Sequence, residues 1–155
     1  MIEKAIRRYP QYDVEEILFE YALCLRCYQD LSQRLSSEST LRLQQFMEQR
    51  TRLGDRAREM LDQYPDDPDA WLDQCIVEGQ PLKESGEYTI CAQAMGDQLI
   101  LGVMPYGLSA SAMDEMTTLL SAKTQDAFDD FRDNHVGGPP DVNEWLRERK
   151  RPVLI

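Results

Sequence analysis

The segment YPDDPD at residues 64–69 is the strongest breaker of regular structure in this chain. Proline lacks a backbone donor and restricts the residue before it, so no helix is expected to run through these positions. The charge balance changes at the same place. Residues 1–64 carry ten basic and eleven acidic groups, whereas residues 65–140 carry three basic and fourteen acidic groups. We therefore expect two halves, 1–64 and 65–155. Because no Gly-rich or Ser-rich linker separates them, we expect one compact unit.

Composition restricts the classes of protein that this chain can belong to. It has 155 residues, a net charge of −11 and 42% hydrophobic residues, which suits a single folded domain with a real core. The negative charge opposes binding to nucleic acid or to an anionic membrane surface. The longest apolar runs are far too short to cross a bilayer, and residues 1–8 lack the apolar centre of a signal peptide. These features predict a cytoplasmic protein.

The first half is predicted to be an antiparallel helical hairpin. Its apolar residues recur with helical spacing, first from Val14 to Leu35 and then from Leu43 to Tyr64. Asp13 is a suitable N-cap for the first helix, and the pair Ser36-Ser37 both ends it and can cap the second. Two long helices joined by so short a turn pack side by side.

The second half is predicted to contain a β-hairpin over residues 87–104. A two-residue turn at Gly96-Asp97 would pair Ala94 with Leu99 and Ile90 with Val103, and would place these side chains on one buried face. A lone hairpin is marginal in water, so it must pack on the later helices, which the pattern places near residues 111–120 and 121–131. The predicted fold class is therefore α+β and mainly helical.

Cys24 and Cys27 form a C-x-x-C pair, which can supply half of a zinc site or a redox-active dithiol. Redox dithiols occur where a strand leads into a helix, because the helix N-terminus lowers a thiol pKa. Here the pair is predicted to lie about ten residues inside a helix. That placement argues against thioredoxin-like chemistry and favours two small buried hydrophobic side chains.

Residues 75–82, with the sequence CIVEGQPL, follow the pattern C-x-x-C-G-x-P-L of a zinc knuckle with Glu78 in place of the second cysteine. A knuckle, a hairpin over 87–104 and a helix from about 111 follow one another here, so the segment 75–121 resembles a degenerate treble-clef zinc module. The resemblance implies two further ligands at the start of the helix. Residues 109–112, with the sequence SASA, offer none, which implies that any metal has been lost. The alternative is an ordinary helix end followed by a Gly-Pro turn.

A metal site across the two halves would use Cys24, Cys27 and Cys75, with Glu78 as a fourth ligand, and zinc is the cofactor that such a set would hold. Otherwise no cofactor is expected. Cys91 is a weaker candidate, because it falls on the opposite face of the predicted hairpin. Four cysteines in a cytosolic chain do not indicate disulfides.

The remaining motifs give no catalytic arrangement. The aspartates at 126, 129, 130 and 133 lie opposite the apolar face of their helix, and the single histidine, His135, has no plausible catalytic partners. Phosphate-binding glycine motifs are absent from the sequence. We therefore predict a non-enzymatic module that binds another protein, for which a basic protein is one candidate, or a second copy of itself. The apolar residues Val153, Leu154 and Ile155 are its predicted contact element. A zinc-binding or thiol-active protein is the alternative.

Overall fold

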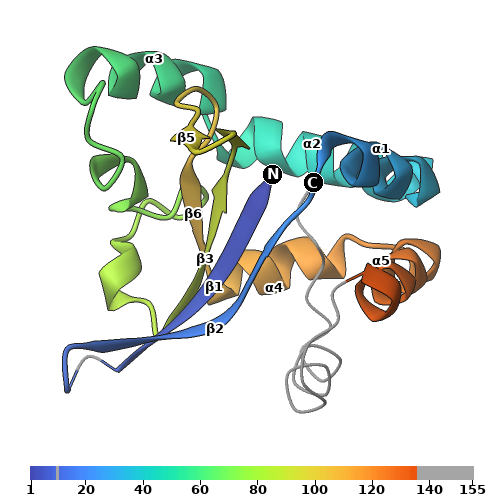
Figure 1. Ribbon diagram of the computed structural model, residues 1–155. Coiled ribbons are helices and arrows are strands. Elements are labelled where there is room, and N and C mark those ends of the chain that lie inside the picture. The colour runs from blue at the N-terminus through green and yellow to red at the C-terminus, as the bar shows by residue number, and fades with distance from the viewer. Residues whose placement is uncertain (10, 136–155) are drawn as a thin grey trace.

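The computed structural model describes residues 1–9 and 11–135, and a four-stranded antiparallel sheet forms its centre (Figure 1). The strands are β1 (Ile2–Tyr9), β2 (Val14–Ala22), β3 (Glu87–Ala92) and β6 (Tyr106–Ser109). They lie in the order β2-β1-β3-β6, so β2 is an edge strand and β1 joins the N-terminal hairpin to the strands of the second half. The two halves of the chain therefore share one sheet.

The predicted N-terminal helical hairpin is wrong, because residues 2–22 form the β1–β2 hairpin. A register shift between Ala5 and Ile6 leaves Leu18 as an extra residue in β2. The bulge changes which residues face inward, so apolar side chains occupy both faces and imitate the spacing of a helix. Asp13 does not cap a helix; it lies in the hairpin turn with a φ of 49°.

Cross-strand charge pairs fix the register of this hairpin. Lys4 pairs with Glu20 and Arg7 with Glu16, at nitrogen–oxygen distances of 3.3 and 3.8 Å, and both pairs are direct register partners. Phe19, which interrupts the helical pattern, is buried and stacks on Tyr21 at a centroid distance of 5.8 Å. Opposite charges on facing positions stabilise an antiparallel pair, so the complementary charges of residues 4–8 and 15–20 are a sequence signal for this hairpin.

Three helices follow: α1 (Leu25–Arg34), α2 (Ser37–Arg50) and α3 (Leu53–Gln63). The predicted break and cap at Ser36 are confirmed, because its hydroxyl accepts a hydrogen bond from the Ser39 amide at 3.1 Å. The helix predicted to continue to Tyr64 is instead broken at Thr51 and Arg52. The breaker at 64–69 ends α3, and only a short 3-10 turn, η1 (Ala70–Leu72), follows it.

The β-hairpin of the second half is only partly as predicted. The turn at Gly96-Asp97 and the pairing of Ala94 with Leu99 are confirmed in the short strands β4 (Ala94–Met95) and β5 (Gln98–Leu99). The register of the longer strands is wrong: Ile90 lies opposite Gly107, not Val103, and Val103 is exposed. β3 pairs with β6 instead. Residues 93–104, which connect these two strands, extend away from the four-stranded sheet.

Helices and irregular segments cover the sheet on both sides. Figure 1 shows α4 (Ala110–Thr118) and α5 (Ala122–His135) on one side, and the segment with η1 and η2 (Leu82–Glu84) on the other. Met113 of α4 is fully buried in the same core cluster as Leu108 of β6. On the other face Leu82 packs against Gly107, where any side chain would collide with it.

The predicted α+β class is confirmed, but the sheet begins at the N-terminus and is larger than predicted. The helix predicted near residue 121 is α5, and Ser121 precedes it with its hydroxyl accepting from the Thr124 amide. Among the described residues, no helix is both long and apolar enough to cross a membrane.

Candidate functional site

The strand β2 leads directly into the helix α1, and the C-x-x-C pair lies at this junction. The strand ends at Ala22, and two hydrogen bonds of 2.7 Å tie the backbone of Leu23 to Met1. Cys24 has extended backbone angles and is the N-cap of α1. The expectation that the pair lies inside a long helix is therefore wrong, because the residues before it form a strand.

The two thiols interact with the start of the helix in different ways. The Cys24 sulfur accepts a hydrogen bond from the Cys27 backbone amide, with a nitrogen–sulfur distance of 3.5 Å. This amide, the Cys27 thiol and the Arg26 amide lower the pKa of Cys24, because they donate to its thiolate. The pKa of Cys27 is raised, first because its thiol donates to Cys24 and then through partial burial. The arrangement therefore keeps the negative charge on Cys24.

The solvent exposure of the two cysteines fits the opposite shifts of their pKa values. Cys24 is exposed to solvent, whereas Cys27 is half-buried and packs against the cluster of Leu31, Phe128 and Phe131. Cys24 is thus not the buried hydrophobic residue that the pattern favoured. An exposed thiolate at a helix N-terminus can attack a disulfide, and a protonated thiol three residues later can resolve the mixed disulfide.

The segment with the sequence CIVEGQPL, residues 75–82, lies against the start of α4. The Glu78 carboxylate accepts hydrogen bonds from the hydroxyl groups of Ser109 and Ser111, the latter at 2.7 Å. The Ser109 amide donates to the Cys75 sulfur at 3.4 Å. The hydrogen bonds from the two serine hydroxyl groups lower the pKa of Glu78, with Ser109 as the largest cause. The carboxylate therefore stabilises the N-terminus of α4 as an anion.

The four predicted metal ligands form two separate pairs. The Cys24 sulfur accepts a hydrogen bond from the Cys27 amide, whereas Cys75 and Glu78 both accept hydrogen bonds from Ser109. Within residues 1–9 and 11–135, no group of three or more His, Cys, Asp or Glu side chains is placed to hold a metal ion. The predicted contact element Val153, Leu154 and Ile155 lies outside the described residues.

The fourth cysteine, Cys91, belongs to a buried polar cluster inside the core. The Tyr21 hydroxyl donates to the buried Glu3 carboxylate, and Cys91 and Tyr106 lie beside them. Burial, followed by the charge of Glu3, raises the pKa of Cys91 well above its ordinary value. Cys91 is therefore a protonated, inaccessible thiol and a poor nucleophile.

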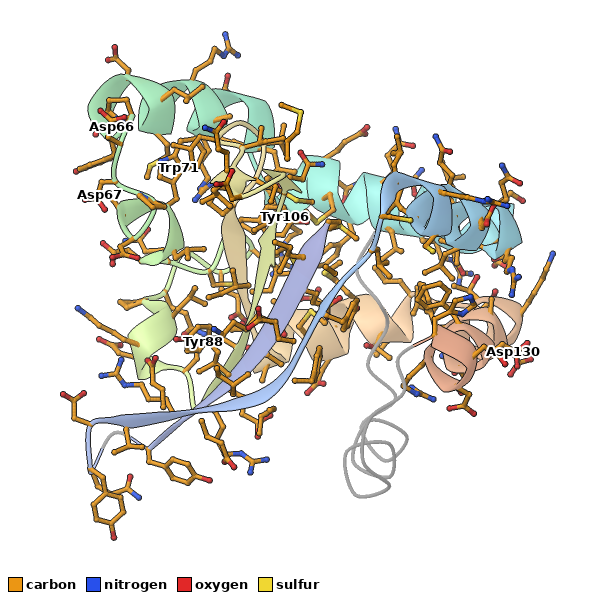
Figure 2. All side chains as sticks on the ribbon, viewed as in Figure 1. Asp66, Asp67, Trp71, Tyr88, Tyr106 and Asp130 are labelled. Atoms are coloured by element: carbon orange, nitrogen blue, oxygen red, sulfur yellow. The ribbon has the colours of Figure 1, made fainter. Side chains whose placement is uncertain are left out.

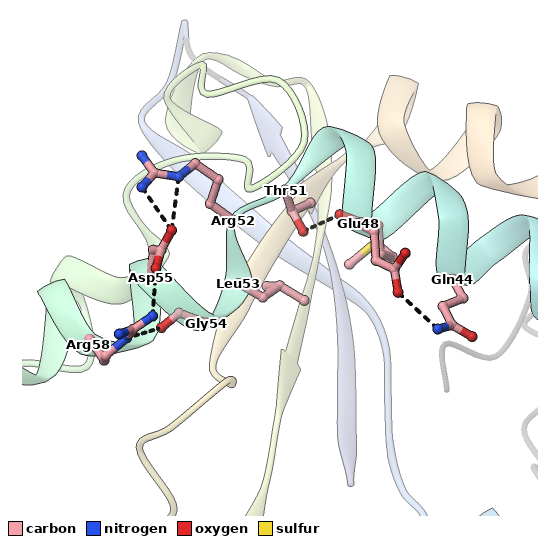
Figure 3. Close-up of a pocket in the computed structure, with 9 residues that line it drawn as sticks. Gln44, Glu48, Thr51, Arg52, Leu53, Gly54, Asp55 and Arg58 are labelled. Carbon is pink, nitrogen blue, oxygen red and sulfur yellow. Dashed lines mark hydrogen bonds and ion pairs between the residues drawn. The ribbon is translucent and has the colours of Figure 1, made fainter.

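Two surface pockets were not predicted from the sequence. The first, about 400 Å³, lies between α2 and α3 (Figure 3). Its charged side chains have partners within the pocket: Asp55 pairs with Arg52 at 2.8 Å and with Arg58 at 2.6 Å, and the Glu48 carboxylate accepts from the Gln44 amide at 2.9 Å. Such internally satisfied charges leave little reason for an ionic ligand to bind there.

The second pocket, about 470 Å³, lies between α3 and η1, beside Trp71 and Asp67 (Figure 2). Its floor is rigid, because Trp71 donates to the Tyr64 carbonyl at 3.0 Å and Arg56 packs over the indole ring. Its lining includes the carboxylates of Asp67, Asp69 and Asp73. This pocket lies in the acidic half of the chain and carries a net negative charge.

The site at Cys24 could have been found from the sequence if residues 14–22 had been recognised as a strand. The two pockets are lined by residues close in the sequence, 44–58 and 56–74, but their shape depends on how α2, α3 and η1 pack, for which local patterns give no signal. Neither protein-family models, nor curated proteins, nor solved structures match this chain in the comparisons made.

Proposed function

We propose that this protein is thiol-active and exchanges disulfides through Cys24 and Cys27. The observation that carries the proposal is the hydrogen bond from the Cys27 amide to the exposed Cys24 sulfur at the N-terminus of α1. A helix N-terminus stabilises a thiolate, and the thiolate is the species that attacks disulfides. The metal-binding form of this hypothesis is less well supported, because the candidate ligands form two pairs in different places.

The chemistry requires only a substrate disulfide as oxidant. The Cys24 thiolate attacks one sulfur of the substrate disulfide, forms a mixed disulfide and releases the other sulfur as a thiolate. Cys27 then loses its proton and attacks the Cys24 sulfur, so the second substrate sulfur leaves as a thiolate. The protein dithiol is oxidised by two electrons to a Cys24–Cys27 disulfide, and the substrate disulfide is reduced to two thiols.

The test uses the coloured disulfide 5,5′-dithiobis(2-nitrobenzoate) with the reduced, folded protein. We expect two thionitrobenzoate ions per chain from the wild type and no stable adduct, because Cys27 resolves the first mixed disulfide. The variant Cys27→Ser should release one ion and retain a thionitrobenzoate group on Cys24. If the wild type also retains stable adducts on both cysteines, the two residues are independent thiols and the proposal is wrong.

A second candidate function is a non-enzymatic module that binds a basic partner protein, as the composition predicted. The pocket lined by Asp67, Asp69 and Asp73 favours it, because these carboxylates surround a cavity large enough for a cationic side chain. Either function suits the cytoplasm, where thiols are kept reduced.

An arginine-rich peptide tests this second candidate. Replacing Asp67, Asp69 and Asp73 by Asn should weaken its binding by about tenfold. The matched control Glu59→Gln/Asp62→Asn/Asp66→Asn removes the same charge from exposed positions outside the pocket. Equal losses in the two variants would mean that only the overall field of the protein attracts the peptide.

A further inference from the structure

An exposed apolar arm leaves the sheet between β3 and β6. It comprises residues 93–104 and includes β4, the Gly96-Asp97 turn and β5. Met95 is 71% exposed and Val103 is 52% exposed, and Leu99 and Ile100 are each 41% exposed. Exposed apolar side chains gathered in one segment indicate a surface that contacts another molecule.

The arm is also nearly free of charge, although 29% of all residues in this protein are charged. Between Glu87 and Asp114, Asp97 is the sole charged residue. The arm is nevertheless ordered by the chain itself, since the Ile100 amide donates to the Gln93 carbonyl at 2.8 Å. A partner would therefore meet a preformed apolar surface without the negative charge that dominates the rest of the molecule.

The strand register places this arm at the same end of the sheet as the dithiol. Ile2 of β1 lies opposite Ala22 of β2 on one side and Ala92 of β3 on the other. Cys24 follows Ala22 by two residues, and the arm begins directly after Ala92. Because neighbouring strands are about 4.8 Å apart, these two exits lie about 10 Å apart. Figure 1 shows the start of α1 and the β4–β5 arm leaving this same end.

The first turn of α1 adds an apolar side chain beside the dithiol. Leu25, between the two cysteines, is 71% exposed and extends the apolar surface at the thiol.

We propose that the arm is the docking surface for the substrate of the dithiol, and that this substrate is a polypeptide disulfide flanked by apolar residues. The inference rests on the proposed function of Cys24 and Cys27. The apolar residues would lie roughly three to six positions from the substrate cysteine, since extended chain spans about 3.3 Å per residue. Small anionic disulfides gain nothing from the arm, and the charge of −11 repels them.

The experiment compares two peptides whose single cysteine is linked to thionitrobenzoate. One carries Leu and Phe at positions four to six from the cysteine, and the other carries Ser there. With the reduced wild type we expect the apolar peptide to react about fivefold faster. The variant Met95→Ser/Ile100→Ser should reduce this preference to less than about twofold. The control Leu41→Ser/Leu61→Ser changes exposed leucines on α2 and α3 and should keep the preference.

The reaction rate with 5,5′-dithiobis(2-nitrobenzoate) distinguishes the docking surface from the thiol function on which it rests. All variants should react with this small disulfide at the wild-type rate. Equal rates for the two peptides, or an unchanged preference in the arm variant, would overturn the docking surface and leave the thiol function standing. A dimer in sedimentation that the arm substitutions dissociate would also overturn it, because a second copy would then occupy the arm. Failure of the wild type to form its disulfide would contradict the thiol function itself.

Discussion

At the scale of single residues, the two cysteines of the C-x-x-C pair differ because only one of them caps a helix. Cys24 accepts from the Cys27 amide, whereas Cys27 donates to Cys24 and is half-buried. The shifts of their pKa values have opposite signs. The dithiol therefore loses its first proton from the exposed sulfur, which is the one that a substrate can reach.

The pH dependence of alkylation tests this difference. We expect the rate at Cys24 to rise with pH with a midpoint below that of an unperturbed cysteine. Cys27→Ala should raise the midpoint, because the thiol donor is lost, but should leave it below that of an unperturbed cysteine, because the backbone amide remains. Cys27→Ser restores a donor and should return the midpoint toward that of wild type. A midpoint that is the same in all three proteins would show that the side chain of Cys27 has no influence.

Glu78 is the second residue whose pKa has a consequence that can be measured. Its folded-state pKa lies below the ordinary value of 4.5, because Ser109 and Ser111 donate to the ionised carboxylate. It therefore stabilises the fold when ionised, and this stability is lost as the pH falls from about 4.5 through the lowered pKa.

Urea unfolding of Glu78→Gln measures this contribution. We expect a loss of about 1 kcal/mol at pH 7, since the side chain is exposed and its hydrogen bonds are partly screened. The difference from wild type should shrink as the pH falls below about 4.5 and the Glu78 carboxylate becomes protonated. Glu84→Gln, at an exposed position in the same half, serves as the control and should change stability little. A difference that persists unchanged at low pH would rule out the ionised carboxylate as its source.

At the scale of elements, the N-terminal β-hairpin determines where the functional site lies. The apolar residues of β2 follow a helical spacing because the bulge at Leu18 interrupts the alternation of inward-facing and outward-facing side chains that a regular strand shows. A helix beginning at residue 14 would place the two cysteines in its middle, whereas the strand β2 places Cys24 at the start of α1. The mirrored charges of β1 and β2 predict the hairpin correctly, but they become informative only when the strands are considered as a pair.

The elements that were predicted correctly depend on local chemistry. Ser36 accepts from an amide three residues later, and Gly96 adopts a φ of +65° in a two-residue turn. Both features need only a few neighbouring residues. The pairing of β3 with β6, by contrast, skips a twelve-residue arm, and the long-range register depends on how Leu108 and Met113 fill the core.

Substitutions in β2 distinguish the strand from the helix that the pattern predicted. Phe19→Ala should destabilise the protein by about 3 kcal/mol, because Phe19 is buried against Ala5. Ile17→Ala should cost less than about 1 kcal/mol, because Ile17 is 57% exposed. A helix with the predicted stripe would reverse this order, since it buries Ile17 and exposes Phe19. Chemical unfolding of both variants decides between the two structures.

At the scale of the whole molecule, one end of the central sheet carries the features on which the functional account depends. The sheet is assembled from both halves of the chain, and its register brings the Cys24 junction and the apolar arm to the same end. The acidic pocket beside Trp71 is built from α3 and the segment after it. The net charge of −11 predicts an acidic surface. It does not show that the nearly uncharged and exposed residues 93–104 interrupt that acidic surface.

The four cysteines also divide by their position in the whole fold. Cys75 and Cys91 are buried in the core, so they should react with thiol reagents only after unfolding. Cys24 and Cys27 are the accessible pair, and the central claim is that they act together as a redox couple.

The most direct test is the equilibrium between dithiol and disulfide in glutathione and dithiothreitol buffers of defined potential. The folded protein is trapped at each potential by alkylation and weighed by mass spectrometry. We predict a single two-electron transition between the dithiol and a Cys24–Cys27 disulfide, at a potential between about −270 and −120 mV, the range of thiol oxidoreductases. A protein that binds glutathione separately on each cysteine, or whose pair stays reduced across this range, would contradict the account.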